Sequence, residues 1–432
     1  NSFVPELATS WEISEDGKTY VFNIREGVKF HEGQDMTPED VAYSFQRGLL
    51  QGGGWSPQWL YTEAFFGIGT ADIAELVNPD CADDAECLQA EDPDALLAVC
   101  QQVMDAIVAD EAAGTVTFNM LESWGPLLAT IAGSWGAVID KDWAAENGAW
   151  DGDCATWQNY YGIGSDNAPL RDVANGTGPY KFDHWTPGEE FVMVANEDYW
   201  RDEPMYEGGP TGAPRLKRVV ATFVDEWGTR FAMAQAGDAD VWTVPGQNYA
   251  QVDPMVGEWC EYIDIGEWDC QPTENPDGPF RLYRGYPLTS RTDAFFVFNI
   301  DAEGGNPYIG SGQLDGNGIP PDFFSDEHVR KAFNYCFDWE IYIQDALAGE
   351  AVQNYGPINQ GLIGYDFDAP HYSYDPDKCA EELELAWDGQ VAENGFRFQV
   401  GFNTGNVTRQ TIASILQSNL AAIDPKYQIE IV

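Results

Sequence analysis

The residue types that most often perform catalysis are present, but their spacing matches no catalytic motif. The sequence contains no GxSxG turn, no HExxH motif and no phosphate-binding loop. His31 follows Phe30 in an expected loop and has no histidine partner at a suitable spacing, so we interpret it as structural. With 72 acidic residues, a glycosidase-like carboxylate pair cannot be singled out. We therefore predict a protein that is not an enzyme and binds no cofactor.

The eight cysteines offer a different chemistry, because an even number favours disulfide bonds. They lie at Cys81, Cys87, Cys100, Cys154, Cys260, Cys270, Cys336 and Cys379. The first two bracket an acidic loop, the fifth and sixth bracket another, and each pair can close as a short clip. Cys336 lies on the apolar face of one expected helix and Cys379 lies near the apolar residues of another, so a bridge could join the two helices, which leaves Cys100 for Cys154. Zinc is the alternative, but no CxxC pair and only four histidines occur, so we expect no metal.

The elements that are easiest to read lie between Pro5 and Arg47. Alternating apolar residues on both sides of the Asp16-Gly17 turn predict a β-hairpin. A helix should follow, because Thr37 can act as N-cap and Pro38 fits the first helical position. Its apolar face comprises Val41, Phe45 and Leu49.

This segment resembles the signature of the family 5 extracellular solute-binding proteins, which are the peptide, nickel and oligosaccharide receptors of ABC importers. The string P-x-LA-x-SWE-x-S-x-DG-x-TY-x-F-x-IR-x-GVKFH-x-G and the following T-x-EDV-x-YSF-x-R carry the likeness. Further blocks follow in the family's order: GTGPYKFDHWTPGEE with NEDYW, RFAMAQAGDAD, FFVFNI, HVRKAFNYCFD and YDPDKCAEEL. The resemblance implies an α/β fold of the periplasmic-binding-protein class, with three lobes and a cleft that closes about a hinge.

A ligand cleft of this class needs aromatic side chains and fixed hydrogen-bonding groups. Among sixteen tryptophans, Trp55 stands beside a glycine run and Trp135 follows an apolar segment, so we select both as candidates. Core packing is the alternative role for each of them.

Two further segments are candidates through the resemblance. The strand from Phe295 to Ile300 corresponds to one that lines the cleft in related peptide receptors, where its edge meets an extended ligand. Its candidate residues are Phe296, Val297, Phe298 and Asn299, with sheet core as the alternative. The turn GFNTGNVTR resembles a strand-to-helix turn that faces the same cleft. Its candidates are Asn403, Thr404, Asn406 and Thr408, with turn and N-cap chemistry as the alternative.

The formal net charge of −51 makes nucleic acid and anionic membrane surfaces poor partners. A solvated acidic surface, suited to salt or to solubility, is the first interpretation of this charge. Attraction of cationic solutes is the alternative, and the charge alone does not separate the two.

We expect three lobes: a smaller one at 1–170, a first main lobe at 171–284 and a second main lobe at 285–432. The smaller lobe should contain an acidic, cysteine-bearing and mostly helical insertion from Asn78 to Asp110. Helical spacing is kept there by Leu96, Val99, Val103 and Ile107. By the resemblance, the chain is truncated at both ends, since it begins after the family's first strand and stops at YQIEIV, where a strand should begin. The W-x-x-D-Y motif, whose Asp holds the peptide's α-ammonium group in peptide-binding relatives, does not occur in this sequence.

Together these features predict the substrate-binding component of an ABC importer, which captures peptides in an interlobe cleft and delivers them to the membrane permease. An oligosaccharide receptor of the same family is the alternative, and a secreted hydrolase is a distant one. We expect a monomer outside the cytoplasm, either periplasmic or lipid-anchored at the cell surface.

Overall fold

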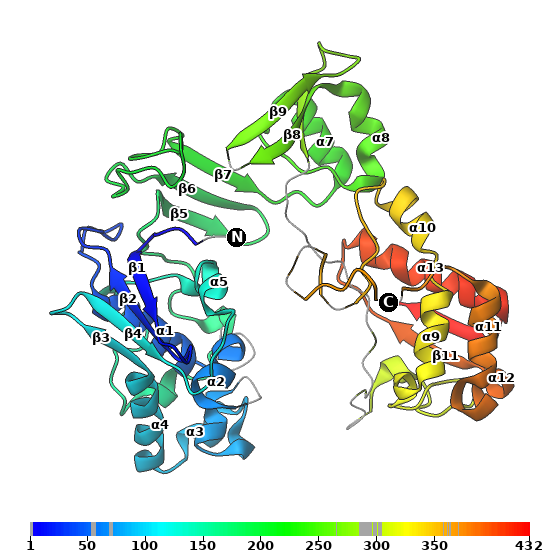
Figure 1. Ribbon diagram of the computed structural model, residues 1–432, viewed down its shortest axis with the longest axis horizontal. Coiled ribbons are helices and arrows are strands. Elements are labelled where there is room, and N and C mark those ends of the chain that lie inside the picture. The colour runs from blue at the N-terminus through cyan, green and yellow to red at the C-terminus, as the bar shows by residue number, and fades with distance from the viewer. Residues whose placement is uncertain are drawn as a thin grey trace. The chain divides into compact units, whose positions relative to one another are not determined.

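The chain forms two compact units, Asn1–Val224 and Asp225–Val432, each of which mixes helices and strands (Figure 1). The computed structural model describes residues 3–52, 58–68, 72–264, 266–284, 296, 300, 305–356, 358–360, 362, 364–369 and 371–432. The mixture of elements agrees with the predicted α/β class. The predicted division into three lobes, with boundaries after residues 170 and 284, stays a prediction.

A four-stranded antiparallel sheet organises the first unit. Its strands are β1 (Ala8–Ile13), β2 (Thr19–Ile24), β3 (Ile107–Asp110) and β4 (Thr115–Asn119), in the order β1-β2-β4-β3. The predicted hairpin is confirmed, and Gly17 in its turn has a φ of +69°, which glycine adopts without a steric penalty. Tyr20 and Phe22 on β2 are buried against the neighbouring helices.

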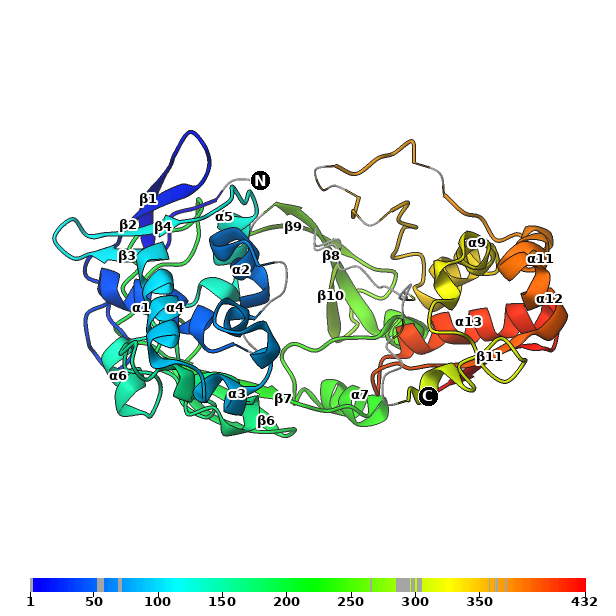
Figure 2. The same cartoon turned by 90° about the horizontal axis from the view of Figure 1, so that it is seen from below.

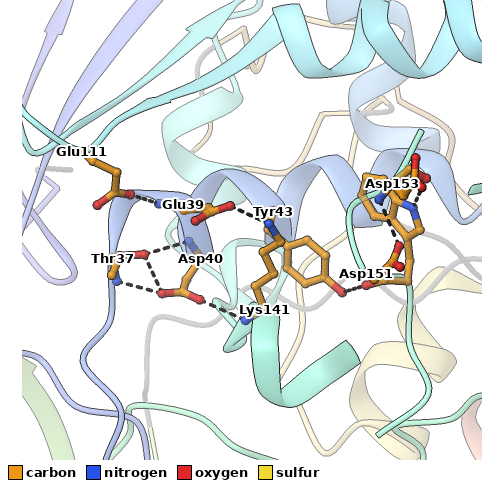
Figure 3. A network of polar contacts seen from close by, with 9 residues as sticks. Thr37, Glu39, Asp40, Tyr43, Glu111, Lys141, Asp151 and Asp153 are labelled. Carbon is orange, nitrogen blue, oxygen red and sulfur yellow. Dashed lines mark hydrogen bonds and ion pairs between the residues drawn. The ribbon is translucent and has the colours of Figure 1, made fainter. Parts of the chain in front are cut away.

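Helix α1 (Pro38–Leu50) begins where the sequence predicts it, and a capping box fixes its start (Figure 3). The Asp40 N–H donates to the Thr37 hydroxyl at 3.3 Å, and the Thr37 N–H donates to the Asp40 carboxylate at 2.8 Å. The other Asp40 oxygen accepts the Lys141 N–H at 2.9 Å, which ties α1 to α6 (Lys141–Glu146). Val41 and Leu49 on the predicted apolar face are buried.

The described residues of the first unit also form the helices α2 (Gln58–Phe66), α3 (Ala85–Gln89), α4 (Pro93–Ala106), α5 (Leu127–Ile131) and α6. Helices α1 and α4 lie against one face of the sheet (Figure 1). The helical spacing predicted through Ile107 ends one residue earlier, because Ile107 has an extended backbone and begins β3. A second antiparallel sheet consists of β5 (Tyr180–Thr186), β6 (Glu190–Ala195) and β7 (Arg218–Thr222).

The second unit starts with α7 (Trp227–Ala236) and α8 (Tyr249–Val252), followed by a small mixed sheet. Its strands are β8 (Val256–Asp264), β9 (Glu267–Pro272) and β10 (Phe280–Arg284), in the order β10-β8-β9. Strands β8 and β9 are antiparallel, whereas β10 runs parallel to β8.

The larger part of the second unit packs helices around two parallel strands, β11 (Phe396–Val400) and β12 (Tyr427–Ile431) (Figure 2). The helices are α9 (Glu327–Tyr335), α10 (Trp339–Ile341), α11 (Pro376–Leu385), α12 (Gln390–Asn394) and α13 (Val407–Ile423). The strand expected at YQIEIV is β12. The core of this part is rich in phenylalanine, including Phe323, Phe333, Phe396 and Phe398.

Disulfide bonds join all eight cysteines in the four predicted pairs. The bridges are Cys81–Cys87, Cys100–Cys154, Cys260–Cys270 and Cys336–Cys379. The last joins the C-terminal end of α9 to α11, as the apolar faces of those helices indicated. In the described ranges we find no helix that combines the length and the apolar character needed to cross a membrane.

Candidate functional site

The polar turn between β11 and α13 contains four of the predicted binding residues, two of which are exposed. Asn406 caps α13, since its side-chain oxygen accepts the Arg409 N–H at 3.0 Å. The Arg409 guanidinium donates to the side-chain oxygen of Asn403, also at 3.0 Å. Asn403 and Thr404 are exposed, and Thr408 is half-buried in the first turn of the helix. The turn therefore presents amide and hydroxyl groups at the positive end of a 17-residue helix.

Phe296 brings the second predicted segment to the same part of the second unit. Its ring stacks on Phe324, with centroids 4.4 Å apart, and it lies 6.1 Å from the ring of Phe398 on β11. Phe296 thus packs against the aromatic core, which is the alternative role considered for it. Val297, Phe298 and Asn299 lie outside the described residues. Phe296 and the turn that follows β11 thus have β11 as a common neighbour.

In the first unit, Trp135 lies in a short 3-10 turn (Ser134–Gly136) after α5, and 43% of its surface is exposed. The Tyr61 hydroxyl donates to the carbonyl of Trp135 at 3.2 Å. Gly133, directly before this turn, and Gly136, its last residue, line a pocket of about 250 Å³ with mainly apolar walls, whereas Trp135 is not among the lining residues. The role of Trp135 in ligand binding stays a prediction. Trp55 lies outside the described residues.

A stack of aromatic rings in the second unit was missed by the sequence interpretation. The ring centroids of Trp227 and Phe231 are 5.4 Å apart at an interplanar angle of 9°, and Trp242 lies 5.8 Å from Trp227. All three side chains are half-buried. The spacing of Trp227 and Phe231, four residues apart on one helix, was a signal that could have revealed the pair. Such a platform can stack on a flat ligand group.

His31 links the opening segment to the GTGPY block, and its contacts agree with the structural role predicted for it. Its Nε2 lies 3.0 Å from the Gly178 carbonyl, and Lys181 donates to the His31 carbonyl at 3.0 Å. Burial lowers the pKa of His31, because the protonated ring would lose the hydration that stabilises its charge in water. The Nδ1 atom is buried without a hydrogen-bond partner in the part of the chain that the structure describes.

These features are typical of a binding protein: exposed hydrogen-bonding groups, an apolar pocket and an aromatic platform on a mixed α/β framework. The chain belongs to the bacterial extracellular solute-binding proteins, family 5 (middle), whose profile matches residues 2–432. Membership in a family of binding proteins supports the prediction that the chain is not an enzyme, and it favours a receptor over the hydrolase alternative.

Similar proteins bind chemically different ligands. The chain is 24% identical over 428 residues to heme-binding protein A of Haemophilus influenzae, covering 98% of this chain and 60% of that protein. It is 23% identical over 436 residues to di/tripeptide-binding protein 2 of Pseudomonas aeruginosa, covering 99% and 63%. The solved oligopeptide-binding protein AppA of Bacillus subtilis, in complex with a nonapeptide, aligns with a TM-score of 0.58 at 19% identity, covering 99% of this chain and 65% of that one. The chain thus spans about three fifths of the length of the curated relatives it matches.

Proposed function

We propose that this chain is the substrate-binding component of an ABC importer, that it captures peptides in a cleft between lobes, and that it delivers them to the membrane permease. The observation that carries the proposal is the family match across residues 2–432. The peptide ligands named for a similar curated protein and for a similar solved structure support it. The chain itself performs no chemistry, and its partners are a small ligand and the permease subunits.

Each unit has its own candidate ligand contacts. In the second unit, the exposed groups of Asn403 and Thr404 bind backbone amides of an extended ligand. The segment from Phe296 to Asn299, expected from the sequence to be a strand, is proposed to offer further backbone groups. In the first unit, Trp55 and Trp135 contribute aromatic surface. Asn406 and Thr408 act more indirectly, because Asn406 holds the start of α13 through its cap bond.

Ligand-dependent thermal stabilisation tests this function. A peptide at a hundred times its dissociation constant should stabilise the folded chain by roughly 2.7 kcal/mol. We expect a set of di- to pentapeptides to raise the melting temperature, and Asn403→Ala to reduce the shift. Asn317→Ala is the matched control, because Asn317 is an exposed asparagine of the same unit outside the candidate segments. Failure of every peptide to raise the melting temperature would refute the peptide assignment.

An oligosaccharide ligand is the second candidate, because sugar rings stack on aromatic faces like those of Trp227, Phe231 and Trp242. A melting temperature that rises with oligosaccharides and not with peptides would favour it. In either case, we propose a monomer that works outside the cytoplasm, periplasmic or lipid-anchored at the cell surface, and that binds no nucleic acid.

A further inference from the structure

A groove of about 340 Å³ runs along α13 on the side that faces α10. Its lining includes Asp338, Ile341, Thr411, Ser414, Ile415 and Asn419. Its volume lies in the range of about 300–1,000 Å³ that is common for small-molecule sites. A π-helical turn (Tyr342–Ala346) directly follows α10, and such turns are frequent near functional sites. None of the predicted binding residues lines this groove.

Three polar side chains of the groove donate hydrogen bonds to backbone carbonyls. The Thr411 hydroxyl donates to the Val407 carbonyl at 2.9 Å, and the Ser414 hydroxyl donates to the Gln410 carbonyl at the same distance. The Asn419 amide donates to the Cys336 carbonyl at 2.8 Å. The oxygens of these three side chains keep lone pairs that can still accept a hydrogen bond. These three side chains therefore favour a ligand that donates hydrogen bonds.

Asp338 adds a negative charge at the α10 side of the groove. Its Oδ1 accepts the Ile341 N–H at 3.0 Å and so caps α10. Within the described residues its Oδ2 forms no hydrogen bond or ion pair, and no lysine or arginine lines the groove. A guanidinium group binds best to a carboxylate with both oxygens available. One available oxygen suits the compact charge of an ammonium group better.

The groove also contains apolar surface. Ile341, on the α10 side, is 51% exposed, and Ile415 on α13 is half-buried. These side chains can pack against methylene groups, in the way that apolar surfaces pack against the methylene stem of a lysine. We propose that the groove binds a primary alkylammonium group, either as a free alkylamine or as a lysine side chain of a peptide. The proposal goes beyond the import function, because none of the residues proposed to contact the imported ligand lines the groove.

The full chain with 1-aminopentane as the probe tests the proposal, with binding measured by calorimetry at low ionic strength. The neutral control ligand is 1-pentanol. Asp338→Asn removes the charge and keeps the helix cap, because Asn caps helices as well as Asp does. Asp375→Asn is the matched control, since Asp375 caps α11 in the same way, lies outside the groove and changes the net charge equally.

We expect the wild type and Asp375→Asn to bind the amine alike, Asp338→Asn to bind it at least tenfold more weakly, and 1-pentanol to bind far more weakly than the amine. Ser414→Ala, which removes one acceptor, should weaken binding several-fold. The proposal fails if the wild type does not bind the amine, if Asp338→Asn binds it as well as the wild type does, or if both Asp variants weaken it equally.

A pair of tripeptides then identifies the source of the ammonium group. Ala-Lys-Ala is compared with Ala-norleucine-Ala, which has a side chain of similar length without the charge. Selective binding of the lysine peptide, lost in Asp338→Asn, assigns the groove to a peptide side chain. Binding of 1-aminopentane without such selectivity assigns it to free alkylamines, and either result supports an ammonium site.

Discussion

Removing the bridge between Cys336 and Cys379 should destabilise the folded chain more than removing the clip between Cys81 and Cys87. The first closes a loop with a sequence separation of 43 residues, and the second one of 6 residues. Loop-closure entropy in the unfolded chain gives about 4 kcal/mol for the long loop and about 2 kcal/mol for the short one. The quantity to test is the difference of about 2 kcal/mol between the two double variants. Effects that the replacements share tend to cancel in this difference.

Alanine is the suitable replacement in both pairs, because Cys81, Cys336 and Cys379 are buried and a serine hydroxyl there would lack a partner. The free energy of unfolding is measured by urea titration without reductant. Hydrogen exchange of the α9 and α11 amides reports the second unit separately from the first. Equal losses in the two double variants, or a larger loss for the short clip, would refute the loop-entropy reasoning.

Three further predictions follow from the charge and from the polar contacts of the first unit. Thr37→Ala should lower the free energy of unfolding by about 1 kcal/mol and Thr37→Ser by much less, because only alanine removes the oxygen that caps α1; equal losses in urea titration would contradict this. Because the pKa of His31 is lowered in the folded chain, its stabilising contribution is complete above the unfolded value of 6.5 and is lost as the pH falls toward the folded value. The acidic partners Glu190 and Asp183 raise the pKa of His184, which therefore acts in the opposite direction. The test is thus the difference in the free energy of unfolding between the wild type and His31→Gln, measured from pH 4 to 8. Identical pH profiles of the two proteins would disprove the role of His31. Finally, the net charge of −51 predicts that the urea midpoint rises between about 0.01 and 1 M NaCl as self-repulsion is screened; a midpoint that falls would exclude self-repulsion as the dominant effect.

Local elements were predictable from the sequence because local chemistry determines them. The start of α1 follows from a hydroxyl at Thr37 and a ring at Pro38, both of which act within one turn. The pairing of Cys336 with Cys379 followed from the apolar faces of two helices that had to meet in one core. The end of α4 was predicted one residue late, because Ile107 is apolar in either state and only pairing with β4 decides for the strand.

The candidate site was less predictable, because its features depend on contacts between distant segments. Alternation along an expected strand predicts that Phe296 and its sequence neighbours point to opposite sides, but it does not say which side is the core. Only the contacts with the rings of Phe324 and Phe398 show that the Phe296 side chain packs in the core. The stack that adds Trp242 to Trp227 and Phe231 joins residues fifteen and eleven positions apart. The groove on α13 has no sequence signature, because a serine or threonine in a helix does not reveal which of its hydrogen-bonding groups stay available.

The groove also gives the acidity of the chain a more specific meaning. A net charge of −51 attracts every cation, so weak amine binding by itself would say nothing about a site. A built site differs from that general field in geometry: it combines one free carboxylate oxygen, acceptors whose donors are already engaged, and apolar surface for the stem. Asp338→Asn and Asp375→Asn alter the general field by the same amount, and only the first alters the groove. A difference between these two variants therefore measures recognition by the groove separately from the attraction of an acidic surface.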